Sequence, residues 1–223
     1  GGGGNDNLTG GAENDELSGG AGADTFNVDA GTDTISDLTT SDILKVSSGA
    51  TANATNVFAF VATSDTSNLG IANIYASGGN ATIDMTLSSS GAYNIYGGAG
   101  NDTLIYVSGT DILDGGAGAD VATFEQLSGT PVVLDLSANQ FVIEGNFSQI
   151  IDIESVRGSH QSDSLTGDQW NNSLYGLDGD DTLLGGAGTD HLYGGFGSDV
   201  FIFSALEDMG VGEGARDIIC LLY

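Results

Sequence analysis

The chain has very few basic residues, one proline and one cysteine. Only 3 of its 223 residues are Lys or Arg, against 31 Asp or Glu, which gives a formal net charge of −28. Because phosphates require Lys and Arg to displace their counterions, we expect no nucleic-acid partner. The single cysteine, Cys220, excludes an internal disulfide. No apolar run approaches the ~20 residues of a membrane-spanning helix, so we expect no membrane span.

The excess of negative charge opposes compaction unless cations bind. High net charge together with 37 glycines is typical of disordered chains, yet 39% of the residues are hydrophobic and they are regularly placed. We therefore expect disorder without divalent cations and a folded chain with them. No signal peptide precedes the first glycines, which already lie inside a repeat, so we expect the chain to be part of a longer protein.

A nine-residue period runs through three parts of the chain. Each complete unit reads Gly-Gly-x-Gly-x-Asp-x-U-x, in which U is large and apolar. The sixth position of successive units, nine residues apart, is held by Asp6, Asp15, Asp24, Asp33 and Asp42, then by Asp102, Asp111 and Asp120, and finally by Asp163, Asn172, Asp181, Asp190 and Asp199. Such internal repetition indicates a solenoid rather than a globular domain.

Between the repeats the glycines thin out and short β-prone runs take over. No segment shows a sustained helical period, and residues 204–210 could form at most one short helical turn. The predicted organisation is one continuous solenoid made of arrays at 1–45, 91–124 and 158–203, spacers at 46–90 and 125–157, and a C-terminal tail at 204–223, which we expect to be truncated.

The residue types within each unit predict its local structure. Glycine supplies positive φ in a sharp turn and lets backbone carbonyls approach an ion. The last three residues form one short strand, and two units make one coil of about 18 residues. The fold class is therefore all-β, a right-handed parallel β-roll or β-solenoid. In such a fold Leu8 and Phe26 stack in neighbouring coils, and Asp6 and Asp24 share one edge about 4.8 Å apart.

Rows of bare carboxylates at this spacing need a cation between them. Two carboxylates ~5 Å apart repel by roughly 3 kcal/mol at an effective dielectric near 20. Calcium fits best, because it accepts six to eight carboxylate and carbonyl oxygens at flexible geometry, whereas magnesium demands a near-ideal octahedron. No cluster of His or Cys is present for zinc or copper.

The nonapeptide resembles the calcium-binding repeat of the bacterial RTX (repeats-in-toxin) hemolysin-type proteins. In that family each ion lies between adjacent turns and takes the aspartate and turn carbonyls of both, and several ions bind. Carried over by position, the resemblance implies as calcium ligands Gly2, Gly4, Asp6, Asp15, Gly20, Gly22, Asp24, Asp33, Gly98, Gly100, Asp102, Asp111, Gly116, Gly118, Asp120, Asp163, Gly179, Asp181, Gly186, Gly188, Asp190, Gly195, Gly197 and Asp199. Turns with Glu13, Gln161, Trp170 or Asn172 depart from the motif, and Asp42 has the spacing without the glycines.

The residues that could suggest an enzyme have simpler interpretations. Ser159, His160 and Asp163 are neighbours in sequence, whereas the members of a catalytic triad meet in space. We interpret them as a polar turn. His191 is expected at the surface, and Cys220 is expected to be a structural or frayed thiol. No motif of a hydrolase or metalloprotease is present, so we expect no enzymatic activity.

The aromatic residues outside the repeats have structural interpretations as well. Trp170 is expected to cap or flank the third array. Tyr75, Tyr93 and Tyr96 could form a sugar-contacting surface, but packing on a sheet is the stronger interpretation.

The resemblance implies a calcium-binding structural and export module of a secreted bacterial protein, located outside the cell or on its surface. Residues 199–208 resemble the segment that closes such arrays. Asp217-Ile218-Ile219 begins the run that precedes a C-terminal signal for type I secretion machinery, but residues 220–223 do not complete it. Two alternatives stay open: the accessory domain of a secreted protease, lipase or polysaccharide-modifying enzyme, and a segment of an adhesin or surface-layer protein. The upstream sequence would distinguish them.

Overall fold

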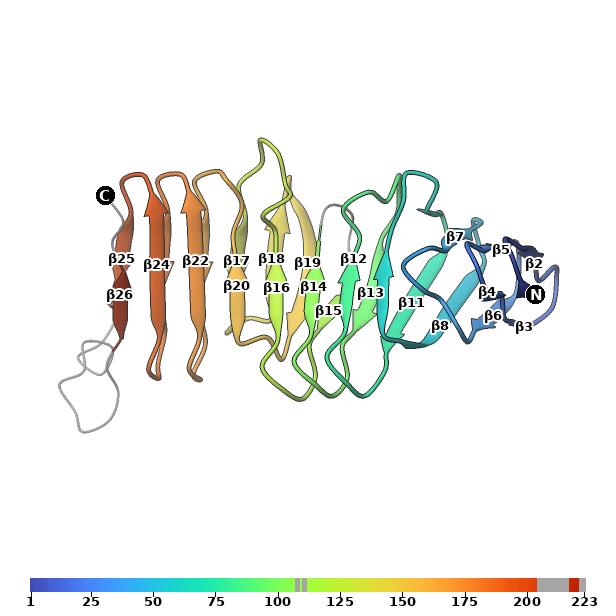
Figure 1. The fold of residues 1–223 in the computed structure, drawn as a ribbon. Coiled ribbons are helices and arrows are strands. Elements are labelled where there is room, and N and C mark those ends of the chain that lie inside the picture. Colours follow the sequence, from blue (N-terminus) through green and yellow to red (C-terminus); the bar gives the residue numbers. More distant parts are fainter. Residues whose placement is uncertain (107–108, 110–111, 204–216, 221–223) are drawn as a thin grey trace. The chain divides into compact units, whose positions relative to one another are not determined.

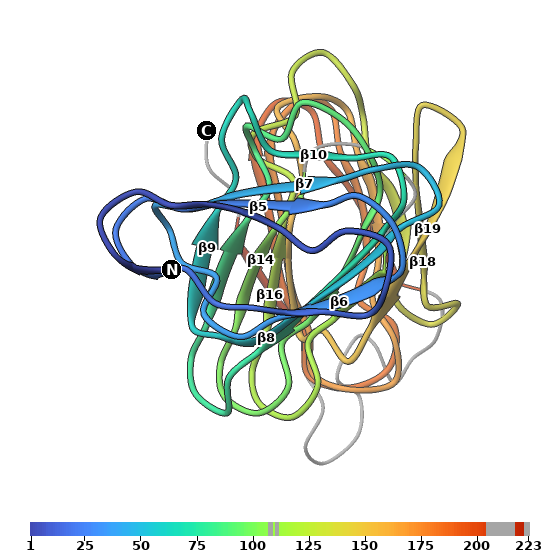
Figure 2. The same cartoon turned by 90° about the vertical axis from the view of Figure 1, so that its right-hand side faces the viewer.

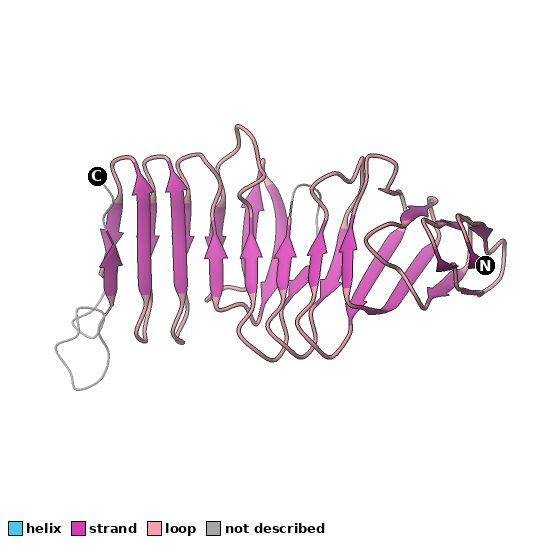
Figure 3. Ribbon diagram, in the orientation of Figure 1, coloured by secondary structure: helices cyan, strands magenta, loops and turns pink. Residues whose placement is uncertain are grey.

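The computed structural model describes residues 1–106, 109, 112–203 and 217–220, and these residues form strands and turns without any helix (Figure 3). They confirm an all-β parallel solenoid. No helix within this described part is long and apolar enough to cross a membrane. The chain divides into two compact units, Gly1–Gly118 and Ala119–Tyr223. The predicted helical turn at 204–210, the second half of the array-closing segment and the end of the tail lie outside the described residues.

The first unit is a stack of coils whose strands pair in parallel. One sheet contains β2 (Asn7–Thr9), β5 (Thr25–Val28), β7 (Ile43–Val46) and β10 (Ser67–Asn68). On the opposite side of the coil (Figure 2) lie β3 (Glu16–Leu17), β6 (Thr32–Ile35), β8 (Thr51–Val57), β11 (Ile71–Ala76), β13 (Tyr93–Tyr96) and β15 (Ile112–Asp114). The remaining strands are β9 (Ala59–Val61), β12 (Thr82–Asp84) and β14 (Thr103–Ile105), and the pair β1 (Gly2–Gly3) and β4 (Gly20–Ala21).

The core of this unit follows from the alternation of each strand. Leu8 lies opposite Phe26, as predicted from the period, and Phe26 in turn lies opposite Leu44. Phe26 and Leu44 are fully buried. Residues one coil apart are 18 positions apart in the array, as at Asp6 and Asp24. The buried apolar side chains of successive strands are therefore stacked in register along the coils.

The spacer at 46–90 continues the same coils with larger turns. Asparagines on neighbouring strands hydrogen-bond in a row: Asn94 Nδ2 donates to Asn73 Oδ1 at 2.8 Å, and Asn73 Nδ2 donates to Asn53 Oδ1 at 2.8 Å. Beside them the rings of Tyr75 and Tyr96 stack with centroids 4.8 Å apart. Tyr93 is buried in the core. These tyrosines thus pack on or within the sheet.

The second unit pairs its strands in two sheets (Figure 1). One contains β16 (Val121–Thr123), β20 (Ser155–Arg157), β22 (Ser173–Asp178), β24 (His191–Phe196) and β26 (Ile218–Cys220). The other contains β17 (Val133–Asp135), β21 (Ser164–Thr166), β23 (Thr182–Leu184) and β25 (Val200–Ile202), together with β18 (Gln140–Ile143) and β19 (Asn146–Ile151).

The strands β17, β18 and β19 depart from the parallel arrangement. β18 pairs antiparallel with both β17 and β19. The reversal from β18 to β19 has a local cause: Glu144 and Gly145 both have positive φ, 53° and 81°, between the paired residues Ile143 and Asn146. Two positive-φ residues form the tight turn that reverses a strand onto itself. Glu144-Gly145 was a hairpin signal in the sequence, although Glu is a less usual residue there than Asn or Asp.

Phe124 and Phe141 are the largest fully buried side chains described in the second unit, and Phe141 lies in β18 of the meander. Their ring centroids are 5.0 Å apart, with the ring planes at 61°. The sequence places Ala122 where the repeat calls for a large apolar residue, and the structure buries Phe124 two residues later. An edge-to-face aromatic pair contributes about 0.5–1.5 kcal/mol beyond its buried area.

Candidate metal-binding turns

The sixth-position aspartates form an aspartate ladder along the edges of the coils. In each case Oδ1 accepts a hydrogen bond from the backbone N–H of the equivalent residue one coil earlier. The bonds run from Asp6 to Asp24 (2.8 Å), Asp15 to Asp33 (3.1 Å), Asp163 to Asp181 (2.8 Å), Asn172 to Asp190 (2.7 Å) and Asp181 to Asp199 (3.1 Å). The ladder fixes one oxygen of each carboxylate and leaves the other directed toward a turn.

In the turns at 19–24 and 176–181 the second oxygen lies against the first glycine of the same turn, whereas Asp33 Oδ2 lies against Gly10 of the turn one coil earlier. A Cβ at Gly19 would overlap Asp24 Oδ2, and a Cβ at Gly176 would overlap Asp181 Oδ2. Only glycine leaves room for the carboxylate there. The predicted ligand set omitted these first-position glycines, although their repetition in the intact units was visible in the sequence.

Glycines at the second and fourth positions stack carbonyls from one coil onto the next. Gly20 and Gly22 have φ of 96° and 142°, and a Cβ on either would overlap the carbonyl oxygen of Gly2 or Gly4. The same relation holds for the pairs Gly116 and Gly98, Gly118 and Gly100, Gly186 and Asp168, Gly188 and Trp170, Gly195 and Leu177, and Gly197 and Gly179. Each such pair of turns brings carbonyl and carboxylate oxygens together.

Two of the carboxylate oxygens are buried without a hydrogen-bond donor. Oδ2 of Asp33 and Oδ2 of Asp181 have no hydrogen-bond partner within the described part of the chain, and both residues are fully buried. Burial, followed by the charges of Asp163, Asp199 and Asp180, raises the pKa of Asp181 to about 6. A buried ionised oxygen without a partner is costly unless a cation compensates it. Carboxylates beside turn carbonyls are the hard oxygen donors that calcium prefers.

This burial has a pH consequence for the calcium-free chain. The pKa of Asp181 in the folded state is about 6, above its ordinary 3.8. The folded state therefore binds more protons than the unfolded state between these values, so its stability rises as pH falls through that window. We expect the β signal of the calcium-stripped chain to increase from pH ~7.5 to pH ~4.5, with Asp181 contributing on the order of 2 kcal/mol.

The measurement is far-UV circular dichroism of the stripped chain over this pH series. Asp181→Asn is the matched control, because its side chain is neutral throughout and its pH dependence should be smaller. A β signal that stays flat or falls on acidification would contradict the assignment.

The predicted site residues reach their expected turns, with one exception. Gly98, Gly100, Gly116 and Gly118 stack in the first unit, and Asp102 and Asp120 are buried at the ends of their turns. Asp111 lies outside the described residues. The list of calcium ligands itself stays a prediction.

Two ladder members were missed: Glu154 does not follow the nine-residue period, and Asp217 follows it three periods after Asp190, beyond the last predicted array. Asp120 N donates to Glu154 Oε2 at 2.8 Å, and Asp190 N donates to Asp217 Oδ1 at 3.0 Å. They lie 34 and 27 residues after their partners. The available signals were the acid-x-apolar pattern of Glu154-Ser155-Val156 and Asp217-Ile218-Ile219 and, for Asp217, its phase with Asp199. Neither residue has glycine at the second and fourth positions before it.

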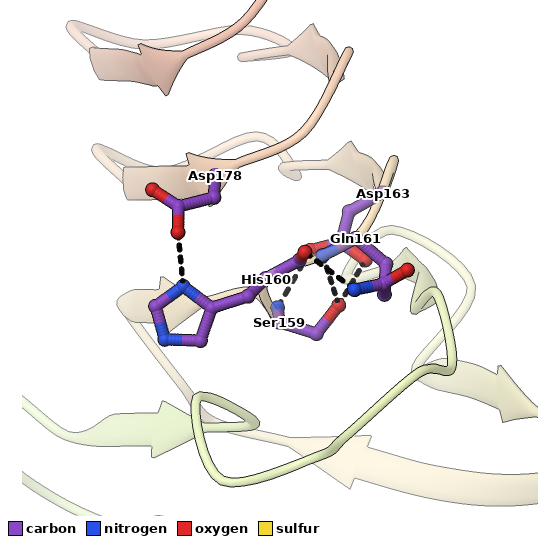
Figure 4. Close-up of polar contacts among 5 residues, drawn as sticks. All are labelled: Ser159, His160, Gln161, Asp163 and Asp178. Carbon is purple, nitrogen blue, oxygen red and sulfur yellow. Dashed lines mark hydrogen bonds and ion pairs between the residues drawn. The ribbon is translucent and has the colours of Figure 1, made fainter.

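The turn at 158–163 is built differently (Figure 4). The fully buried Ser159 donates from N and Oγ to Asp163, at 2.6 and 2.8 Å, while His160 Nδ1 faces Asp178 Oδ2 at 2.9 Å in the next coil. The serine and the histidine thus have different carboxylate partners. This arrangement supports the interpretation of a polar turn.

Other predicted exceptions also find local partners. Asp42 Oδ2 accepts hydrogen bonds from Thr39 N and Thr39 Oγ1, both at 2.8 Å. Trp170 is exposed at the turn of its coil. His191 is half-buried with its ring 6.4 Å from that of Tyr193, and Cys220 is partly exposed.

Leu177 occupies the second position of its turn, where the backbone conformation favours glycine. Its φ is 85°, and the equivalent residue of the next coil is Gly195, with φ of 105°. Positive φ strains a branched side chain by about 1–3 kcal/mol, whereas the added backbone freedom of glycine costs about 0.4–1 kcal/mol. We expect Leu177→Gly to raise the free energy of unfolding in excess calcium by about 1 kcal/mol.

Urea unfolding monitored by circular dichroism tests this. Leu177→Ala retains the strained φ and should give no gain. A Leu177→Gly chain less stable than the parent chain would show that the leucine side chain contributes more by packing than its backbone loses by strain.

Comparison with known protein families agrees with this geometry. The family model described as RTX calcium-binding nonapeptide repeat (4 copies) matches residues 1–35, 94–122 and 166–201. The three matched stretches contain most of the aspartate ladder, with Asp42, Glu154, Asp163 and Asp217 outside them, and leave the spacers unmatched. A search of curated proteins found no match.

Proposed function

The chain is a calcium-binding repeat protein of the RTX type, and from this premise we propose that it serves as the folding and export module of a secreted bacterial protein. It crosses the membrane unfolded through type I secretion machinery and folds outside the cell when calcium binds between its coils. The single observation that carries the proposal is the pair of buried carboxylate oxygens, on Asp33 and Asp181, that have no hydrogen-bond donor among the residues that the structure describes.

The location of folding follows from the difference in calcium concentration across the membrane. With a Kd near 10⁻⁴ M, typical of extracellular modules, ~1 mM calcium stabilises the folded chain by roughly 1.4 kcal/mol per site. Submicromolar cytosolic calcium adds almost nothing. Repulsion within a chain of formal charge −28 then opposes folding before export.

We propose that the chain itself carries no catalytic centre. The support is that Ser159 and His160, the residues closest to a hydrolytic arrangement, hydrogen-bond to Asp163 and Asp178, respectively. The role proposed for the turns is therefore to hold ions and coils together rather than to transform a substrate.

A calcium titration of the stripped chain tests the proposal. We expect a cooperative rise in far-UV β signal with several ions bound per chain by calorimetry, and no comparable rise with magnesium. A chain already folded without calcium, or one that binds no ion, would overturn it.

A further inference from the structure

One coil of the second unit has two turns that lack the backbone conformation of the calcium turns. The glycines at positions two and four of the regular turns have positive φ, as at Gly186 and Gly188. The equivalent residues of the turns at 158–163 and 167–172 are Ser159, Gln161, Asp168 and Trp170, and none of them is among the positive-φ residues. These two turns therefore reach their sixth position by a different backbone path from the regular turns.

Side-chain hydrogen bonds close the first of these turns. Ser159 Oγ donates to Asp163 Oδ1 at 2.8 Å and accepts from Gln161 N at 3.1 Å. Asp163 Oδ1 also accepts from Val132 N at 2.7 Å, and its Oδ2 accepts from Ser159 N at 2.6 Å. Both oxygens of Asp163 are thus satisfied by protein donors, in contrast to Oδ2 of Asp181 one coil later.

The second turn replaces the charged residue itself. Asn172 is a neutral amide whose Oδ1 accepts from Asp168 N at 2.9 Å, and Asp168 Oδ1 in turn accepts from Trp170 N at 2.8 Å. Asn172 is buried at the position that an aspartate holds in the regular turns. No charge repulsion from this side chain has to be compensated there.

The same coil is paired with strands beside the two largest fully buried side chains described in the unit, Phe124 and Phe141. β20 pairs with β16, and β21 pairs with β17 of the meander that buries Phe124 and Phe141. By contrast, the following coils bury one leucine per strand, Leu183 in β23 and Leu192 in β24. Area burial and local hydrogen bonds thus support residues 121–172 without an ion.

We infer that residues 121–172 form a calcium-independent nucleus in the second unit, on which residues 176–202 fold when calcium binds. The inference rests on the proposed calcium-dependent function and adds to it a direction of assembly. Asp163 belongs in this interpretation to the hydrogen-bonded turns and not to the calcium ligands. Asp181 Oδ1 accepts from Asp163 N at 2.8 Å, so the first calcium-dependent turn is held directly on the nucleus.

Hydrogen exchange of the full chain, followed by mass spectrometry with calcium and with EGTA, tests the inference. On calcium removal we expect peptides from 121–172 to lose less than about tenfold in protection and peptides from 176–202 to lose more than about 100-fold. Equal loss in both segments would overturn the inference while leaving the calcium module intact. No loss in either segment would overturn the proposed function and the inference together.

A pair of serine variants separates the hydrogen-bonded turn from the calcium turns. Ser159→Ala removes the hydroxyl that closes the turn at 158–163, and we expect protection of that segment in EGTA to fall by about tenfold. Ser198→Ala, in an exposed position of the calcium turn at 194–199, is the matched control and should change neither segment. If Ser159→Ala leaves exchange in EGTA unaltered, the turn is not closed by this bond and the nucleus is not assigned correctly.

Discussion

Withdrawal of calcium is expected to lower the melting temperature of this chain more than any single substitution. At ~10 mM calcium and a Kd near 10⁻⁴ M, each occupied site contributes about 2.7 kcal/mol to the folded state. For a chain of this length, 1 kcal/mol corresponds to roughly 2–4 °C in melting temperature. Each site should therefore raise the melting temperature by about 5–10 °C. With several sites occupied, the melting transitions of the calcium-loaded chain and of the stripped chain should not overlap.

Thermal unfolding by circular dichroism over a calcium series measures this effect. The melting temperature should rise with the logarithm of the calcium concentration and should not rise with equal magnesium. Sodium chloride at matched ionic strength is the control for simple screening of the net charge. A melting temperature independent of calcium would show that the aspartate ladder is stable without ions.

Gly22→Ala is expected to be among the most damaging single substitutions. Gly22 has φ of 142°, and its added Cβ would overlap the carbonyl of Gly4 in the preceding coil. Gly4 occupies the same position of its own turn with φ of 104°, but a Cβ there meets nothing within 4 Å. We expect Gly4→Ala to lower the free energy of unfolding by about 1–2 kcal/mol, because of backbone strain. Gly22→Ala should lower it by about 3 kcal/mol or more, because overlap with Gly4 adds to the strain.

Urea unfolding of both variants in excess calcium gives this comparison, and calorimetry shows whether an ion is lost with the stability. Gly78→Ala, at a site without positive φ or nearby atoms, controls for the loss of a glycine as such. Equal costs at Gly4 and Gly22 would mean that neighbouring coils separate easily and that the stacked carbonyls are not fixed.

The regular parts of this fold were predictable because two repeats match one coil. Two periods of nine residues make 18, the spacing at which Asp6 meets Asp24 and Asp163 meets Asp181. The same spacing placed Leu8 opposite Phe26. Strand alternation and the conformational freedom of glycine are local properties, so they can be derived from any single unit.

The irregular parts depended on contacts that no period describes. In the meander of β17, β18 and β19, the turn from β18 to β19 is at Glu144-Gly145, whose residues only loosely match the usual hairpin signal. Glu154 joins the ladder 34 residues after Asp120, because the inserted meander separates two coils that the period would place side by side. The length of such an insertion does not indicate which later residue rejoins the aspartate ladder.

Taken by itself, the sequence determined the coil, the direction of its apolar side chains, the aspartate lines and the preference for calcium, because each of these follows from residue types repeated at fixed spacing. Only the tertiary structure decided which carboxylate oxygens are left without donors and which are closed by a neighbouring hydroxyl, as Asp181 and Asp163 show. The physical reason is that hydrogen-bond satisfaction depends on the geometry of whole turns stacked on one another, and a single unit does not contain that geometry.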